Sequence, residues 1–214
     1  MIRVLIVDDH AVVREGIKRI VDATQDIEAA GEAGTGQEAL ALAAKEEFDV
    51  VLLDIGMPGR SWLDTLHRFQ DEHPRAAVLI LSVHPEEQYA VRALRAGAAG
   101  YLNKAGAPEE LIQAVRTVFR GRKYVTPALA EVLAGALGPA GERPDHDRLS
   151  DREHEVLRLL ASGDPVGKIA EDLCLSPKTV STYRTRLLLK LGVKTNAELT
   201  HYAIRHGLID IPGS

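Results

Sequence analysis

The chain has 214 residues and carries 26 Lys and Arg against 31 Asp and Glu, which gives a net charge of −5. The charge is divided unevenly, because residues 1–147 carry a net −7 (16 basic, 23 acidic) and residues 148–214 a net +2 (10 basic, 8 acidic). No apolar run approaches the ~18 residues of a membrane span, and the lone cysteine, Cys174, allows no intrachain disulfide. These features argue against a membrane protein or a disulfide-stabilised secreted protein. We expect two globular domains in a reducing cytoplasm, the second better suited to an anionic partner.

The first 120 residues alternate short apolar runs with helical patterns. The apolar runs predict strands at 2–7, 50–53, 78–81 and 100–102, with a weaker strand at 27–30. Apolar residues at helical spacing predict helices over 12–21, 62–72, 86–96 and 108–120. Thr35 followed by Glu38 predicts a capping box at the start of a further helix. This alternation predicts an α/β fold with a parallel sheet covered by helices on both faces.

A change of pattern marks the end of this region. Residues 126–137 begin with a Thr-Pro pair and predict one more short helix. Residues 138–148 are polar, rich in Pro and Gly and without apolar periodicity, which is typical of a linker. From Ser150 onward the patterns are purely helical, with a capping box formed with Glu153 and a later N-cap at Ser176.

Polar side chains follow four of the predicted strands. Asp8 and Asp9 follow the first strand, Asp54 the third, Ser82 the fourth and Lys104 the fifth. Each alone is most often a turn, cap or solvated residue, but ligands of open parallel sheets bind at the carboxyl ends of the strands. Three carboxylates brought together repel one another, and oxygen ligands of this kind suit Mg²⁺. A carboxylate there can become an aspartyl-phosphate, with the cation, the lysine and the hydroxyl stabilising the phosphoryl oxygens.

These residues lie in strings that resemble the receiver domains of response regulators. The strings are VDDH at 7–10, LDIGMPG at 53–59, LS at 81–82 and AGAAGYLNK at 96–104. The resemblance covers roughly residues 1–120 and implies a flavodoxin-like, doubly wound parallel sheet of five strands. It implies that a sensor histidine kinase phosphorylates Asp54 and that the receiver catalyses its own phosphorylation and dephosphorylation. The implied site residues are Asp8, Asp9, Asp54 and Gly56 for Mg²⁺, Lys104 for the phosphate, and Ser82 and Tyr101 for the switch.

Two positions depart from the receiver pattern. Ala105 stands where many receivers have Pro directly after the lysine, which leaves the geometry of that loop open. Trp62 stands where receivers usually have Gly, a residue that tolerates positive φ. We expect Trp62 either to shift the loop after Asp54 or to cover the phosphate site.

The C-terminal region contains a concentrated basic run. Between Leu173 and Ala197 five basic residues occur with no acidic one: Lys178, Arg184, Arg186, Lys190 and Lys194. A charge run is usually a solvated face, but this one follows an N-cap at Ser176, and a helix N-terminus favours phosphate. At 100° per residue, Val180, Tyr183, Leu187 and Leu191 form an inner face. The outer face and its flanks carry Lys178, Ser181, Thr182, Thr185 and Arg186.

Residues 149–208 resemble the helix-turn-helix of the LuxR/NarL/FixJ class. The strings are LSDREHEVL at 149–157, KIAEDL at 168–173, LSPKTVSTY at 175–183 and KLGV at 190–193. The resemblance implies an all-α domain of four helices that binds double-stranded promoter DNA, with RNA polymerase as a candidate partner. The candidate DNA contacts are Lys168, Lys178, Thr179, Ser181, Thr182, Thr185, Arg186 and Lys190. The resemblance also implies a dimer contact at Leu199, Tyr202 and Ala203, although core packing alone explains most of that apolar character.

The sequence therefore predicts a receiver at 1–122, a helix and linker at 123–148 and a DNA-binding domain at 149–214. The predicted function is that of a two-component response regulator, which is phosphorylated on Asp54 with Mg²⁺, dimerises and regulates transcription. One alternative is a DNA-binding regulator with a silent receiver, against which the intact set of site residues argues. A phosphohydrolase with an Asp nucleophile needs a second Asp two residues later, where this chain has Gly56.

Overall fold

The chain forms two compact units, Met1–Leu137 and Gly138–Ser214. The computed structural model describes all residues except 58–60, 84–85, 137–145, 147–148, 174 and 210–214, which include nearly all of the predicted linker. No described helix combines the length and apolar character needed to cross a lipid bilayer.

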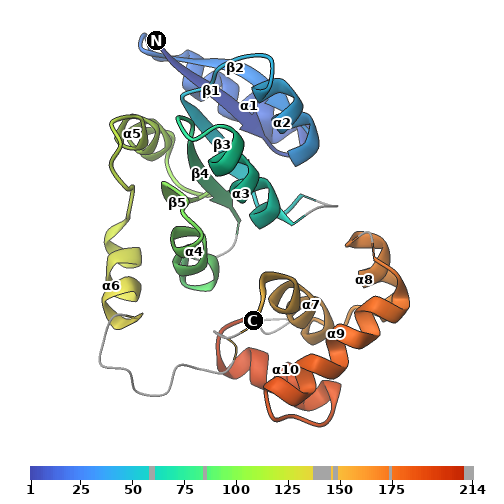
Figure 1. Ribbon diagram of the computed structural model, residues 1–214. Coiled ribbons are helices and arrows are strands. Elements are labelled where there is room, and N and C mark those ends of the chain that lie inside the picture. Colours follow the sequence, from blue (N-terminus) through green and yellow to red (C-terminus); the bar gives the residue numbers. More distant parts are fainter. Residues whose placement is uncertain (58–60, 84–85, 137–145, 147–148, 174, 210–214) are drawn as a thin grey trace. The chain divides into compact units, whose positions relative to one another are not determined.

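The first unit is built on a parallel sheet of five strands in the order β2-β1-β3-β4-β5 (Figure 1). The strands are β1 (Ile2–Val7), β2 (Ile27–Ala33), β3 (Val50–Asp54), β4 (Ala77–Ser82) and β5 (Gly100–Asn103). Every residue of β3 is buried, as expected for a central strand covered on both faces. The strand order reverses between β1 and β3, which is where doubly wound sheets bind their ligands. The predicted fold class is confirmed.

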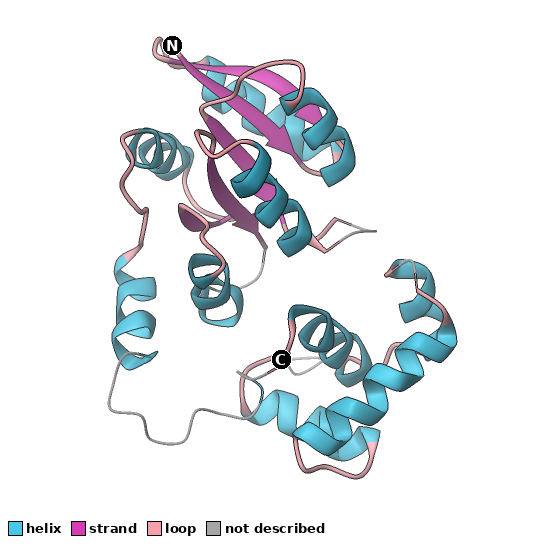
Figure 2. Ribbon diagram, in the orientation of Figure 1, coloured by secondary structure: helices cyan, strands magenta, loops and turns pink. Residues whose placement is uncertain are grey.

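Helices cover both faces of this sheet (Figure 2). They are α1 (Ala11–Asp22), α2 (Gly36–Ala43), α3 (Trp62–Glu72), α4 (Glu86–Arg95) and α5 (Pro108–Phe119). Side chains alternate between the faces along β1, so that Leu5 packs in one apolar cluster and Val4 and Ile6 in the other. The first cluster includes Leu66 of α3 and the second Ile17 of α1.

The start of α2 differs from the prediction. Thr35 caps the helix as expected, because its hydroxyl accepts a hydrogen bond from the Glu38 amide at 3.1 Å. The carboxylate of Glu38, however, accepts from the amide of Gly34 at 2.9 Å instead of that of Thr35. The predicted capping box is therefore wrong in its second half, because the carboxylate satisfies the donor one residue earlier.

A sixth helix, α6 (Pro127–Ala136), follows and packs against α4. Its N-cap is Thr126, whose hydroxyl accepts a hydrogen bond from the amide of Leu129 at 3.1 Å. Leu129 is fully buried in the same apolar cluster as Leu66. The helix predicted after the receiver is thus part of the first compact unit.

The described part of the second unit contains four helices: α7 (Asp151–Ala161), α8 (Val166–Asp172), α9 (Pro177–Lys190) and α10 (Asn196–Arg205). The predicted capping box of Ser150 and Glu153 is confirmed at the start of α7. Ser176 caps α9, and Gly192 with φ +66° follows its end, a backbone conformation that glycine adopts without penalty.

Candidate functional site

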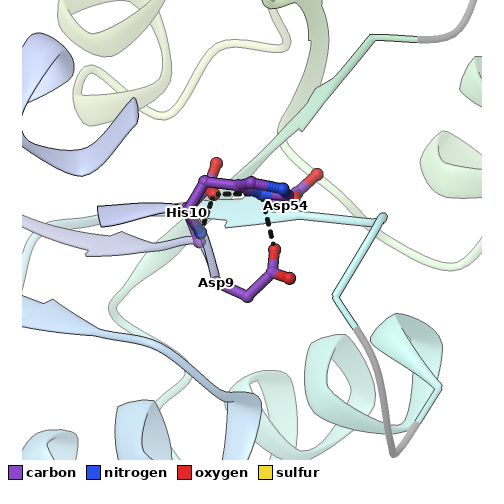
Figure 3. A group of neighbouring side chains, drawn as sticks. Asp9, His10 and Asp54 are labelled. Carbon is purple, nitrogen blue, oxygen red and sulfur yellow. Dashed lines mark hydrogen bonds and ion pairs between the residues drawn. The ribbon is translucent and has the colours of Figure 1, made fainter. Parts of the chain in front are cut away.

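The predicted carboxylates meet at the carboxyl ends of β1 and β3. Asp8 follows β1 and Asp54 ends β3; both are buried, whereas Asp9 is exposed. Ligand atoms of Asp8, Asp9, His10 and Asp54 all lie within 4.8 Å of one another. Figure 3 shows Asp9, His10 and Asp54 gathered at this edge of the sheet. The sheet topology therefore brings together residues that are 46 positions apart in the chain.

Lys104 provides the positive charge of this cluster. Its ammonium lies 2.6 Å from Oδ2 of Asp8 and 2.8 Å from Oδ2 of Asp54, and its side chain is 13% exposed. Its backbone amide donates to the carbonyl of Ser82 at 2.7 Å, which connects it to the end of β4. We call Asp8, Asp9, His10, Asp54 and Lys104 the acidic site. Carboxylates outnumber the lysine, so the acidic site favours a further cation.

Backbone amides hold the two buried carboxylates in place. The amide of His10 donates to Oδ1 of Asp8 at 2.8 Å, and the amide of Gly56 donates to Oδ1 of Asp54 at 3.0 Å. Each carboxylate therefore has one oxygen bound to the backbone and the other to Lys104. Gly56 therefore contacts Asp54 through its amide, and its predicted part in a Mg²⁺ site stays a prediction.

The donor set of the acidic site suits Mg²⁺. Three carboxylates supply hard oxygen ligands, and Asp9 is exposed enough to share a cation with water. His10 was not predicted as a site residue, although it directly follows the acidic pair. Its Nδ1 lies 2.9 Å from Asp9 Oδ1 and 3.4 Å from Asp8 Oδ1.

Arg14 is a second residue that the sequence analysis missed. Its guanidinium donates to the backbone carbonyl of Asp8 at 2.7 Å, and its Nε lies 3.5 Å from a carboxylate oxygen of Glu32 in β2. Arg14 therefore supports the backbone that carries the metal-ligand candidates. Its position one turn into the helix after the acidic pair is the only sequence signal for this role.

The predicted switch residues are both buried. Ser82 ends β4, where it pairs with Asn103, the residue before Lys104. Tyr101 is fully buried in β5, within the same apolar cluster as Leu129 of α6. The structure thus places Ser82 at the edge of the acidic site and Tyr101 in the core beneath α4 and α6.

The two departures from the receiver pattern have local structural answers. Trp62 is the first residue of α3, after the N-cap Ser61, and its side chain is only 9% exposed. The Trp62 side chain packs in the apolar core. At the position where receivers usually have Gly, this chain therefore has the first residue of a helix. After Lys104, the amide of Ala105 donates to Oδ1 of Asn103 at 2.8 Å, a bond that proline could not make.

A second candidate site is the outer face of α9. Lys178, Ser181, Thr182, Thr185 and Arg186 are all exposed, and we call them the exposed stripe. The hydroxyls of Thr182 and Thr185 donate to the carbonyls of Lys178 and Ser181 at 3.0 and 3.1 Å. These bonds fix the threonine rotamers and leave the hydroxyl oxygens as acceptors.

Three other predicted DNA contacts have partners within the domain. The hydroxyl of Thr179 lies 2.8 Å from that of Ser176, within the N-cap of α9. Lys168 donates to Asp164 at 2.7 Å, and this bond raises the pKa of the lysine above its usual value. Lys190 donates to Glu153 at 2.7 Å.

The predicted dimer residues lie in the core of the C-terminal unit. Leu199 and Ala203 are fully buried and Tyr202 is 9% exposed, all within one apolar cluster. Packing within the domain therefore accounts for their apolar character. A dimer contact through α10 remains a prediction. The exposed side chains of α10 would have to form such a contact.

Comparisons with known proteins agree with both regions. Residues 4–116 match the family described as response regulator receiver domain, and residues 147–203 match bacterial regulatory proteins of the luxR family. The chain is 39% identical to the response regulator GacA of Pseudomonas aeruginosa over 211 residues, covering 98% of this chain and 99% of GacA. It is also 39% identical to the response regulator UvrY of Escherichia coli over 209 residues, covering 97% and 96%.

A solved structure resembles the whole chain. RcsB from Salmonella enterica serovar Typhimurium, bound to the promoter rprA in the presence of phosphomimetic BeF3⁻, aligns with a TM-score of 0.68. The two chains are 28% identical, and the alignment covers 94% of this chain and 98% of RcsB.

Proposed function

The chain belongs to the response regulators that join a receiver domain to a LuxR-type helix-turn-helix, and we propose that phosphorylation of Asp54 controls its binding to DNA. The observation that carries this proposal is the buried Asp54 carboxylate, held 2.8 Å from Lys104 beside two further aspartates. A silent receiver would have no use for three carboxylates and a lysine at one sheet edge, since burying charges costs free energy.

Phosphoryl transfer requires few protein groups at this site. An oxygen of Asp54 attacks the phosphorus of a phosphohistidine in a sensor histidine kinase, and the bond from phosphorus to the histidine nitrogen breaks. Mg²⁺, when bound, offsets the repulsion between the carboxylates and the incoming phosphoryl group. Asp8, Asp9, Asp54 and the backbone carbonyl at Gly56 would hold it.

Two further groups would bind the transferred phosphoryl group. Lys104 already reaches Asp54 and can turn to a phosphoryl oxygen, and Ser82 carries a hydroxyl on the neighbouring strand. These residues would let the receiver catalyse its own phosphorylation and dephosphorylation. Ser82 and Tyr101 would then transmit the change toward α4 and α6.

We propose domain bounds of 1–122 for the receiver, 123–148 for the helix and linker, and 149–214 for the DNA-binding domain. The end of α5 at Phe119 and the Ser150 cap of α7 support these bounds. Because α6 packs on α4, the compact unit extends further than the proposed receiver.

In the DNA-binding domain, the exposed stripe would enter the major groove of promoter DNA. Lys178 and Arg186 would contact phosphates, which supply affinity without sequence information. Ser181, Thr182 and Thr185 would contact base edges or a thymine methyl. Phosphorylation would promote a homodimer in the cytoplasm, and RNA polymerase is a candidate further partner.

A binding experiment with and without phosphorylation tests the proposal. The chain is incubated with Mg²⁺ and a small-molecule phosphodonor, and its affinity for DNA sites recovered from a genomic library is compared before and after. We expect the affinity to rise in the treated protein and not in an Asp54→Ala variant. Equal affinity in all samples would instead favour the regulator with a silent receiver.

A further inference from the structure

The last residue of α9 is bound to the first turn of α7. Nζ of Lys190 donates to Oε2 of Glu153 at 2.7 Å, and the Glu153 side chain is only 5% exposed. The same oxygen accepts hydrogen bonds from the amide and the hydroxyl of Ser150, at 2.8 and 3.0 Å. One carboxylate oxygen therefore joins the N-cap of α7 to Lys190, which lies 37 positions after Glu153 in the chain.

The neighbouring residue of α7 contacts the other helix of the helix-turn-helix. Arg152 donates to the backbone carbonyl of Leu173, the C-cap residue of α8. It is oriented by an ion pair with Glu155 at 2.6 Å. Two consecutive residues of α7 thus bind the end of α8 and the end of α9.

Charge balance favours the contact of Lys190, whose side chain is 46% exposed, with the buried carboxylate of Glu153. Burial of the Glu153 carboxyl opposes its ionisation, but the hydrogen bonds from Lys190 and Ser150 outweigh burial and lower its pKa. Releasing Lys190 would leave a buried carboxylate without its cation, which is costly. Lys178 is exposed as Lys190 is, but it makes no ion pair within the described part of the chain.

We propose that Lys190 is a positioning residue that sets the angle of α9 against α7, and not a DNA-phosphate contact as its charge suggests. The inference rests on the proposed binding of DNA by α9. Its consequence is that Lys190 governs discrimination between DNA sequences, because base contacts depend on helix orientation more than phosphate contacts do.

Matched substitutions separate the two roles. Lys190→Gln and Lys178→Gln each remove one cation from α9, and their affinities are measured for a duplex that the unsubstituted chain selects from a randomised pool and for a scrambled version of it. We expect Lys190→Gln to lower the ratio of the two affinities by roughly tenfold, while the salt dependence of binding is unchanged. Lys178→Gln should lower both affinities equally and reduce the salt slope by about one. The proposal is overturned if Lys190→Gln behaves as Lys178→Gln does, or if it changes nothing.

Glu153→Gln is a further test, because the two roles of Lys190 predict opposite changes in DNA affinity for this variant. Glutamine also suits this position of a capping box, so α7 keeps its cap while Lys190 loses its ionic partner. If Lys190 is a positioning residue, Glu153→Gln should lower the affinity for the selected duplex. If Lys190 binds phosphate, its release from the ion pair should raise that affinity. Lys190→Arg should restore the ratio that Lys190→Gln loses.

Thermal unfolding tests the contact apart from DNA. If the unsubstituted chain selects no duplex, the proposed function fails, but a double-mutant cycle between Lys190→Gln and Glu153→Gln still measures the coupling of the pair. Additive effects of the two substitutions on unfolding would overturn the positioning role even then.

Discussion

The acidic site and the exposed stripe of α9 use charge in opposite ways. In the acidic site, Asp8, Asp54 and Lys104 are buried or nearly so and come from strand ends up to 96 residues apart. The exposed stripe spans Lys178 to Arg186 on a single helix, and its side chains face solvent. Charges of the first kind hold one another in a fixed geometry, whereas those of the second kind are free to meet a partner.

This difference determines how each region responds to its surroundings. Buried ion pairs are screened little by salt, while exposed cations depend strongly on ionic strength. Salt should therefore weaken DNA binding far more than it alters the acidic site. The contrast also predicts which substitutions act on one region and leave the other intact.

The largest expected effect is the loss of phosphorylation in Asp54→Asn. The substitution keeps the size of the side chain but removes the nucleophilic carboxylate, so labelling from a small phosphodonor with Mg²⁺ should disappear. Asp71→Asn, an exposed carboxylate of α3, is the control and should label normally. Persistent label on Asp54→Asn would place the acceptor elsewhere, and a change in basal DNA binding would contradict the separation of the two regions.

A core substitution should destabilise one unit only. Leu66 is fully buried under the sheet, so Leu66→Ala should lower the free energy of unfolding of the first unit by about 2–5 kcal/mol. Calorimetry should show its transition shifted and that of the C-terminal unit unchanged. Val12→Ala, at a side chain that is 86% exposed, should shift neither. Equal shifts of both transitions in Leu66→Ala would mean that the units unfold together.

Within the exposed stripe, Thr182→Ala should change which base is preferred. The lost contact should cost about 1–3 kcal/mol at one base pair and little elsewhere. Selection from randomised DNA measures this preference, with Lys178→Ala as the matched variant that lowers affinity at all sites. If Lys178→Ala changed the preferred base and Thr182→Ala lowered the affinity at all sites, the proposed placement of the exposed stripe in the major groove would be wrong.

Ser82→Ala should weaken the link between the two regions. The hydroxyl sits at the edge of the acidic site, so its loss should leave labelling of Asp54 mostly intact. The gain in DNA affinity on phosphorylation should fall by about 1 kcal/mol, roughly fivefold. DNA titrations of labelled and unlabelled protein measure this gain, and an undiminished gain would exclude Ser82 from the switch.

The smallest expected effect is on the acid stability of the C-terminal unit. Because the pKa of Glu153 is lower in the folded unit than its ordinary value of 4.5, its contribution is complete above that value and is lost as the pH falls through the folded pKa. Thermal unfolding measured down through pH 4.5 should show this loss. Lys190→Gln should lose less stability over this pH range. A pH profile identical to that of the unsubstituted chain would contradict the assignment of this stability to the ion pair of Glu153 with Lys190.

Much of this protein follows from local sequence patterns. The strands, the helices with their caps at Ser150 and Ser176, and the polar residues at the strand ends all depend on neighbours within a few positions. The resemblance to receivers and to LuxR-type domains rests on such short strings too. For this reason the sequence predicts the fold class and four residues of the acidic site, Asp8, Asp9, Asp54 and Lys104, but not His10.

Only the tertiary structure decided the partners of the charged residues. That Lys104 bridges Asp8 and Asp54, and that Lys190 pairs with Glu153, depends on elements brought together from distant parts of the chain. For Leu199 the sequence allows both a core and a dimer role, and the structure shows that its side chain is buried in the core of the C-terminal unit. Periodicity shows which face of a helix is apolar, but what covers that face is decided by how the helices pack.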